Sequence, residues 1–203
     1  GVGEGSRGRK ILNRRESEAA FRHRISTWCA PRAFEPFSDD SPEALMVRPI
    51  TFSIDIEAMR HNLERVRARA NGRKVWAVVK ANAYGHGIEN AVKGFAQADG
   101  LALLEIEEAQ RARETGWKKR IVMLEGFFDA EDLARLEVLD VETIVHDRWQ
   151  IELIRTTPHQ NLRVHLKVNS GMNRLGFDPG EVPGLIDELN AIAGVKVVGI
   201  VTH

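Results

Sequence analysis

Apolar and polar residues follow two different spacings along most of this chain. In several stretches apolar side chains recur three or four positions apart, as in Leu133 and Leu136 or in Leu185 and Leu189, which is the spacing of one helix face. Asp129 can cap the first of these helices. Short contiguous apolar segments separate the helical stretches; they lie at 75–79, 101–104, 121–124, 143–145, 164–168 and 197–201. Strands that alternate with helices predict an α/β protein with a parallel sheet.

The number of these units leaves two folds open. The pattern supplies about six strand units before His203, whereas a closed (β/α)8 barrel has eight. By itself the pattern is consistent with an open doubly wound sheet or with an incomplete barrel.

The segment before the first apolar run has a pattern of its own. Apolar residues at every second position over 50–56 predict a strand with one buried face. Asp55 can cap the helix that follows. The apolar stripe expected for that helix consists of Met59, Leu63, Val66 and Ala70.

Residues 1–47 differ from the rest of the chain. Arginines are scattered among Gly, Ser and Glu without periodicity, which predicts a disordered or extraneous segment. A targeting peptide is the alternative, but Glu4, Glu16 and Glu18 do not suit an acid-poor transit sequence. Because the chain opens on Gly1, we expect a fragment or an over-extended reading frame, with Met46 as a natural start.

The charge balance favours a small-molecule partner. Lys plus Arg and Asp plus Glu number 29 each, so the totals do not favour nucleic acid or an anionic membrane. No apolar run approaches the roughly 20 residues that span a bilayer, and the single cysteine, Cys29, fits a reducing compartment. We therefore expect a soluble, cytoplasmic protein. The histidines show no metal-ligand spacing, so no metal site is expected.

Lys80 is the first candidate for chemistry. It follows the run 75–79, which lacks polar alternation and predicts a strand covered on both faces. At the carboxyl end of such a strand, partial desolvation favours the neutral amine that attacks a carbonyl. Lys80 is therefore a candidate imine former; the alternative is an exposed lysine after a core strand.

Two later strands end in similar candidates. Arg174 lies between Gly171 and Gly176, and its planar guanidinium suits a carboxylate or a phenolate, although it could also be a surface loop arginine. Lys167 lies within an apolar strand, so it needs a partner or a change of charge. His203 follows the last strand, where a histidine is more often structural than catalytic.

Charged residues also gather on the helix predicted near residue 110. They are Glu105, Glu107, Glu108, Arg111 and Arg113. Close pairs of opposite charge are typical of a solvated helix face, and we interpret them in that way.

Two segments resemble the signatures of a known family. Residues 78–87, Val-Val-Lys-Ala-Asn-Ala-Tyr-Gly-His-Gly, are similar to the pyridoxal-phosphate attachment segment of alanine racemases, a highly specific motif. Residues 166–176, Leu-Lys-Val-Asn-Ser-Gly-Met-Asn-Arg-Leu-Gly, resemble the second signature of that family. Residues 124–128 and the pair Thr202-His203 fall in the expected order, so the resemblance covers residues 48–203.

The resemblance implies a (β/α)8 barrel domain that binds pyridoxal 5'-phosphate, with about six of its eight units present in residues 48–203. Complete members add a β-rich carboxyl-terminal domain, which is absent from this sequence. They interconvert L-alanine and D-alanine for peptidoglycan and are cytoplasmic homodimers with the active site at the interface. The alternatives are an amino-acid racemase of broader specificity and a barrel that binds the cofactor without turnover.

The resemblance also implies roles for single residues. Lys80 would hold the cofactor as an internal aldimine and move the α-proton on the D-alanine face. Tyr84 would reach the cofactor phosphate, Arg174 the phenolic oxygen and the substrate carboxylate, and His203 would lie beside the pyridine ring. Lys167 matches a position that is carbamylated in many members, and a carbamate beside Arg174 would remove a buried positive charge.

The sequence departs from the family pattern in two respects. Asn169 stands where the family usually has aspartate, which could loosen the loop that aims Arg174. Tyr84 is the only tyrosine, so the second base, which members take from the carboxyl-terminal domain of a partner subunit, is missing. We therefore expect the 203 residues alone not to racemise alanine at an appreciable rate.

Overall fold

The computed structural model describes residues 51–203, in which six parallel strands form one sheet. Each strand pairs with the next one along the chain. The strands are β1 (Trp76–Val78), β2 (Gly100–Leu103), β3 (Arg120–Met123), β4 (Glu142–Val145), β5 (Leu162–Val168) and β6 (Val195–Thr202). They match the six apolar segments of the sequence, with ends shifted by one or two residues.

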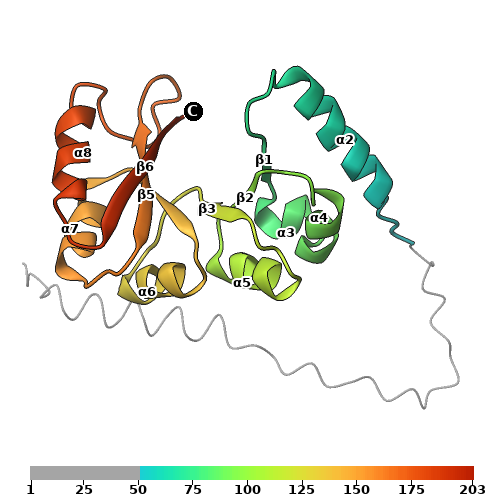
Figure 1. Ribbon diagram of the computed structural model, residues 1–203, viewed down its shortest axis with the longest axis horizontal. Coiled ribbons are helices and arrows are strands. Elements are labelled where there is room, and N and C mark those ends of the chain that lie inside the picture. The colour runs from blue at the N-terminus through green and yellow to red at the C-terminus, as the bar shows by residue number, and fades with distance from the viewer. Residues whose placement is uncertain (1–50) are drawn as a thin grey trace, which may run out of the picture. The chain divides into compact units, whose positions relative to one another are not determined.

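Helices connect the strands and cover one face of the sheet; in Figure 1, α5 and α6 lie beneath the strands and α7 and α8 beside them. The helices are α2 (Ile56–Arg69), α3 (Lys80–Tyr84), α4 (Ile88–Gly94), α5 (Ile106–Glu114), α6 (Ala130–Val138), α7 (Arg148–Thr156) and α8 (Val182–Asn190). Their apolar sides and the outer face of the strands form one continuous core. Ala109, Leu133 and Ile151, from three different helices, are fully buried in it.

The strand order decides between the two folds that the sequence left open. A doubly wound sheet reverses its order at a switch point, whereas this sheet runs in sequence from β1 to β6. Its other face carries a small apolar cluster of Ala102, Val122 and Ile144 and lines a cavity. Residues 51–203 therefore form six strands of an incomplete (β/α)8 barrel, as the resemblance implied.

The strand predicted at 50–56 does not form in the described part of this segment. Residues 51–55 are irregular, α2 begins at Ile56, and Phe52 is 72% exposed. Among the described strands β1 pairs only with β2, so residues 51–55 have no neighbour there to complete a ladder of hydrogen bonds. Asp55 does cap α2, because its carboxylate accepts a hydrogen bond from Ala58 N (3.0 Å).

Two valines are more exposed than the sequence predicted. Val66, in the expected stripe of α2, is 53% exposed, and Leu63 is the buried residue of that helix. Val78 is 44% exposed, so β1 is not covered on both faces. Successive residues of a strand point to opposite faces; Val79 enters the helix-covered core, and Val78 faces the cavity.

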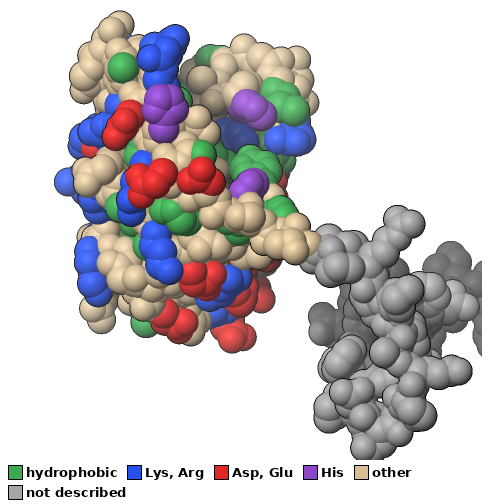
Figure 2. Space-filling model, turned by 90° about the vertical axis from the view of Figure 1, so that its right-hand side faces the viewer, with side chains coloured by type: hydrophobic (Ala, Val, Ile, Leu, Met, Phe, Trp, Pro, Cys, Tyr) green, Lys and Arg blue, Asp and Glu red, His purple; other side chains and the backbone are tan. Residues whose placement is uncertain are grey.

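Other expectations concern the surface and the ends of the chain. Residues 1–47, predicted to be disordered or extraneous, lie outside the described residues. Within residues 51–203, no helix combines the length and apolar character needed to cross a membrane. Figure 2 shows basic and acidic side chains interspersed on one face of the molecule, in line with the equal numbers of both charges.

The cap of α6 gives a first prediction about stability. Asp129, predicted as a cap, accepts a hydrogen bond from Asp132 N (2.8 Å). We expect Asp129→Ala to lower the free energy of unfolding by about 1 kcal/mol, measured by urea denaturation. Glu131→Ala, an exposed position in the same first turn, is the control and should cost only a few tenths of a kcal/mol. Equal losses in both variants would contradict the capping role.

Candidate functional site

A cavity of about 660 Å³ opens at the carboxyl ends of the strands, on the face of the sheet opposite the helices. This volume is typical of a site for a small molecule. The structure brings together in its lining all five residues selected from the sequence: Lys80, Tyr84, Lys167, Arg174 and His203.

An unusual stretch of backbone begins directly after Lys80 and ends with Tyr84. The four consecutive residues from Ala81 to Tyr84 have φ values between 52° and 55°, so α3 is a left-handed turn. For residues other than glycine this conformation costs roughly 1–2 kcal/mol each, or on the order of 4–8 kcal/mol for the turn. Backbone strain persists only where the surroundings enforce it, and it gathers at functional sites.

The loop after β5 presents Arg174. Asn169, at the position where an aspartate is usual and its absence could loosen the loop, accepts a hydrogen bond through Oδ1 from Asn173 N (3.1 Å). At Gly176 φ is +117°, and a Cβ would lie 2.8 Å from Asn169 N. The loop therefore needs glycine at this position.

The same loop is fastened to the end of β6. Met172 N donates a hydrogen bond to His203 O (3.0 Å), and the hydroxyl groups of Ser170 and Thr202 are hydrogen-bonded to each other. These contacts place the Arg174 loop and His203 at the same rim of the cavity.

Lys167 faces the cavity from β5. Burial lowers its pKa, the positive charge of Arg174 lowers the pKa further, and Glu125 partly opposes both effects. These surroundings disfavour the charged form of the lysine, as expected for an amine on an apolar strand.

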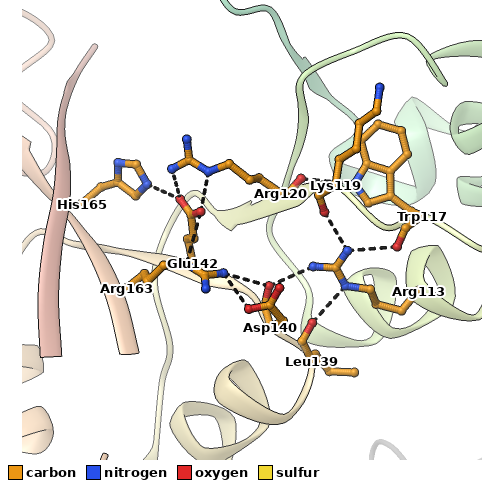
Figure 3. Close-up of polar contacts among 9 residues, drawn as sticks. All are labelled: Arg113, Trp117, Lys119, Arg120, Leu139, Asp140, Glu142, Arg163 and His165. Carbon is orange, nitrogen blue, oxygen red and sulfur yellow. Dashed lines mark hydrogen bonds and ion pairs between the residues drawn. The ribbon is translucent and has the colours of Figure 1, made fainter. Parts of the chain in front are cut away.

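A group of charged residues that the sequence analysis did not select lies on strands β3, β4 and β5 (Figure 3), and two of them, Arg120 and His165, line the cavity. Glu142, at the start of β4, is 1% exposed; it accepts hydrogen bonds from Arg120 (2.5 and 2.6 Å) and from His165 Nε2 (2.6 Å). The Arg120 guanidinium also lies 4.9 Å from the ring centroid of Trp76. Burial raises the pKa of Glu142, but the hydrogen bonds from His165 and Arg120 outweigh it and lower the pKa from 4.5 to about 2.

Two glycines make room for the rings of Trp76 and His165, which lie beside these charged residues. A Cβ on Gly100 would lie 2.4 Å from the Trp76 ring, and one on Gly199 would lie 2.5 Å from His165 Nδ1. Both rings therefore pack directly against the backbone of a neighbouring strand, which only glycine permits here.

The charged residues at helix α5 form the predicted solvated face only in part: Glu105 and Glu107 are exposed, whereas Glu108, Arg111 and Arg113 are buried or half-buried. Arg113 donates hydrogen bonds of 2.7–2.9 Å to four backbone carbonyls (Figure 3), those of Trp117, Lys119, Leu139 and Asp140. Glu108 is 7% exposed, whereas Glu107, with a 64% exposed side chain paired to Arg135, fits the prediction. The burial of Glu108 could have been predicted from the sequence, because Glu108 and the buried Ala112 are four residues apart and share a helix face.

Known proteins resemble this chain in sequence over the same region. The family model described as "Alanine racemase, N-terminal domain" matches residues 54–203. An alanine racemase of Janthinobacterium sp. (strain Marseille) is 49% identical over 159 residues, which are 78% of this chain and 44% of the relative. A catabolic alanine racemase of Klebsiella aerogenes is 46% identical over 159 residues, 78% of this chain and 45% of the relative.

Solved structures resemble it in fold as well. The biosynthetic alanine racemase from Pseudomonas aeruginosa superimposes with a TM-score of 0.69 at 36% identity, covering 74% of this chain and 42% of that structure. The chain thus spans less than half the length of the curated relatives that it matches.

Proposed function

Because this chain belongs to the family of alanine racemase N-terminal domains, we propose that residues 48–203 are the cofactor-binding barrel of a pyridoxal-phosphate-dependent enzyme that interconverts L-alanine and D-alanine. One observation carries the proposal: five side chains of the right chemical types, from separate strand ends and loops, line one cavity. The similarity to alanine racemases supports it.

The cavity residues suit pyridoxal phosphate. When bound, this cofactor would supply the electron sink that stabilises negative charge on the substrate α-carbon. Lys80 Nζ is the amine that would bond to its aldehyde carbon with loss of water, and the Tyr84 hydroxyl would donate to its phosphate. Arg174 would serve its phenolic oxygen and the substrate carboxylate, and His203 would lie beside its ring. Between them these residues provide a nucleophile, two kinds of hydrogen-bond donor and a flat packing surface.

Each residue has a further task in the proposed reaction. Lys80 Nζ, once free, would take and return the proton at the α-carbon on one face of the substrate. Tyr84 is the single tyrosine of the chain, so the proposal assigns the base for the opposite face to a residue outside these 203. Lys167, as a neutral amine, could add carbon dioxide and lose a proton, and the resulting carbamate would offset the charge of Arg174.

The resemblance drawn from the sequence implies a wider setting for this activity. We extend the proposal to a cytoplasmic homodimer with the active site at its interface, which supplies D-alanine for peptidoglycan. The small-molecule partner would be alanine.

Reductive trapping tests the proposal. The chain is incubated with pyridoxal phosphate, reduced with borohydride, digested and mapped by mass spectrometry, and we expect a pyridoxyl group on Lys80. A label on another lysine, or no label, would contradict the proposal.

The substrate requires a second measurement, made with the whole gene product. Racemisation of alanine should exceed that of serine, lysine and arginine. Faster turnover of the larger amino acids would indicate a racemase of broader specificity, and a label without any racemisation would indicate a barrel that only binds the cofactor.

A further inference from the structure

The left-handed turn at residues 81–84 is held from outside by helix α5. We propose that Glu108 and Arg111 are positioning residues that enforce this turn and so keep Lys80 and Tyr84 directed into one cavity. This inference rests on the proposed function and deepens it, because it names the residues that set the geometry of the cofactor lysine.

Asn82, in the middle of the turn, receives the contacts from α5. Its backbone N–H donates a hydrogen bond to the Glu108 carboxylate. Its side-chain oxygen accepts hydrogen bonds from Arg111 Nη1 (3.1 Å) and from Ile88 N (3.3 Å). Both groups of Asn82 are thus fixed by residues that do not belong to the turn.

Bonds inside the turn complete the arrangement. The Asn82 carbonyl accepts from Gly85 N (3.1 Å) and Gly87 N (2.8 Å), and Ala83 N donates to Val79 O (2.9 Å). Local bonds of this kind also exist in right-handed turns, so they do not by themselves select the left-handed form. The selection has to come from the contacts with α5.

Helix α5 is a rigid support for these contacts. Its residues Ala109 and Ala112 are fully buried in the core. The Arg111 guanidinium is itself oriented by Glu89, which accepts two hydrogen bonds from it (2.9 and 2.8 Å). Glu108 Oε2 has no hydrogen-bond partner among residues 51–203, so the bond to Asn82 N is the contact that accounts for burying this carboxylate.

The contacts of Glu108 and Arg111 with Asn82 are called the clamp below. Loss of the clamp should affect the site more than it affects the stability of the fold. Ala81, Asn82 and Tyr84 are exposed and only Ala83 of the turn belongs to the core, so a relaxed turn would disturb one small core side chain. It would, however, change the direction of the Tyr84 side chain relative to that of Lys80, because the backbone between them would reverse its hand. The affinity for pyridoxal phosphate should fall as a result.

The test compares variants of the 203-residue chain. Glu108→Leu should weaken covalent binding of pyridoxal phosphate, followed by absorbance, by about tenfold or more, as expected for loss of a charged hydrogen bond. It should also raise amide hydrogen exchange over residues 80–88 by about tenfold. Glu107→Leu, the matched control on the same helix, should leave both within about twofold. Glu108→Gln should keep the affinity and the exchange rates close to those of the unaltered chain, because its amide oxygen can accept the same hydrogen bond.

A glycine substitution separates enforced strain from a general loss of structure. Ala81→Gly, added to Glu108→Leu, should recover most of the affinity, because glycine adopts positive φ without a steric penalty. If Glu108→Leu does not fold, Arg111→Met carries the test, since this arginine side chain is 41% exposed. Unchanged exchange and unchanged affinity in the clamp variants would overturn the inference, as would an equal loss in Glu107→Leu.

Failure of the proposed function would look different. If the unaltered chain forms no adduct at Lys80, the proposed function is wrong. Hydrogen exchange alone then tests whether Glu108 and Arg111 enforce the turn. Raised exchange at residues 80–88 in Glu108→Leu would support it, and unchanged exchange would overturn it.

Discussion

Replacing Lys80 by arginine is expected to reduce covalent binding of pyridoxal phosphate from one group per chain to background. Arginine keeps the charge and much of the length of the side chain, but its guanidinium does not lose its proton in proteins and cannot attack an aldehyde. The measurement is the amount of pyridoxyl label per chain after borohydride reduction. Lys93→Arg, at an exposed position of α4, is the control and should keep the full label.

Lys167 is the alternative site for the label in this experiment. It lines the same cavity, and burial and the charge of Arg174 lower its pKa, so it is the competing amine for the cofactor aldehyde. We nevertheless expect the label on Lys80, because Tyr84 follows it across the strained turn and brings a hydroxyl group for the cofactor phosphate into the same cavity. A label that persists in Lys80→Arg and maps to Lys167 would show that the assignment of the two lysines is reversed.

The strands were predictable because of where they lie. A parallel strand with helices on one face and a barrel interior on the other is a contiguous apolar run, and such runs stand out in a sequence. The prediction at 101–104 and the observed strand β2 at Gly100–Leu103 differ by one residue. Their order in the sheet was not predictable from the pattern, because it depends on contacts between distant strands.

Elements that depend on a neighbour were predicted less well. The alternation at 50–56 is typical of a strand, but a strand also needs a partner, and none of the described strands pairs with residues 51–55. The left-handed turn was hidden for a similar reason. Glycines such as Gly85 and Gly87 are typical of a turn, yet nothing local in Ala81 or Ala83 favours positive φ, and the cause lies in α5.

Buried charged residues were the other feature that the sequence analysis did not predict. Glu108 lies on a highly charged helix and Glu142 at the start of an apolar strand, and carboxylates are usually exposed. Their burial depends on partners that are distant in sequence, Asn82 for the first and Arg120 and His165 for the second. A charged residue at a core-facing position of a helix or strand is the signal that could have identified both.

Glu142→Gln is expected to destabilise the fold by about 3 kcal/mol near neutral pH, measured by urea denaturation. The substitution removes the negative charge that Arg120 and His165 share in the barrel interior. The three partners come from adjacent strands β3, β4 and β5, so the loss falls on the sheet itself. Glu152→Gln is the control, because this carboxylate is 64% exposed and pairs with Arg155 at 3.6 Å; its effect should stay below about 1 kcal/mol.

Acid should remove the difference between Glu142→Gln and the unaltered chain. The pKa of Glu142 is lowered from 4.5 to about 2 in the folded protein. A carboxyl group with a lowered folded pKa stabilises the fold above its unfolded pKa, and this contribution is lost as the pH falls through the folded pKa. The pKa difference of about 2.5 corresponds to on the order of 3 kcal/mol. The unfolding free energies of the two proteins should therefore converge between about pH 4.5 and pH 2, and a constant gap over that range would show that the Glu142 charge is not what holds Arg120 and His165 in place.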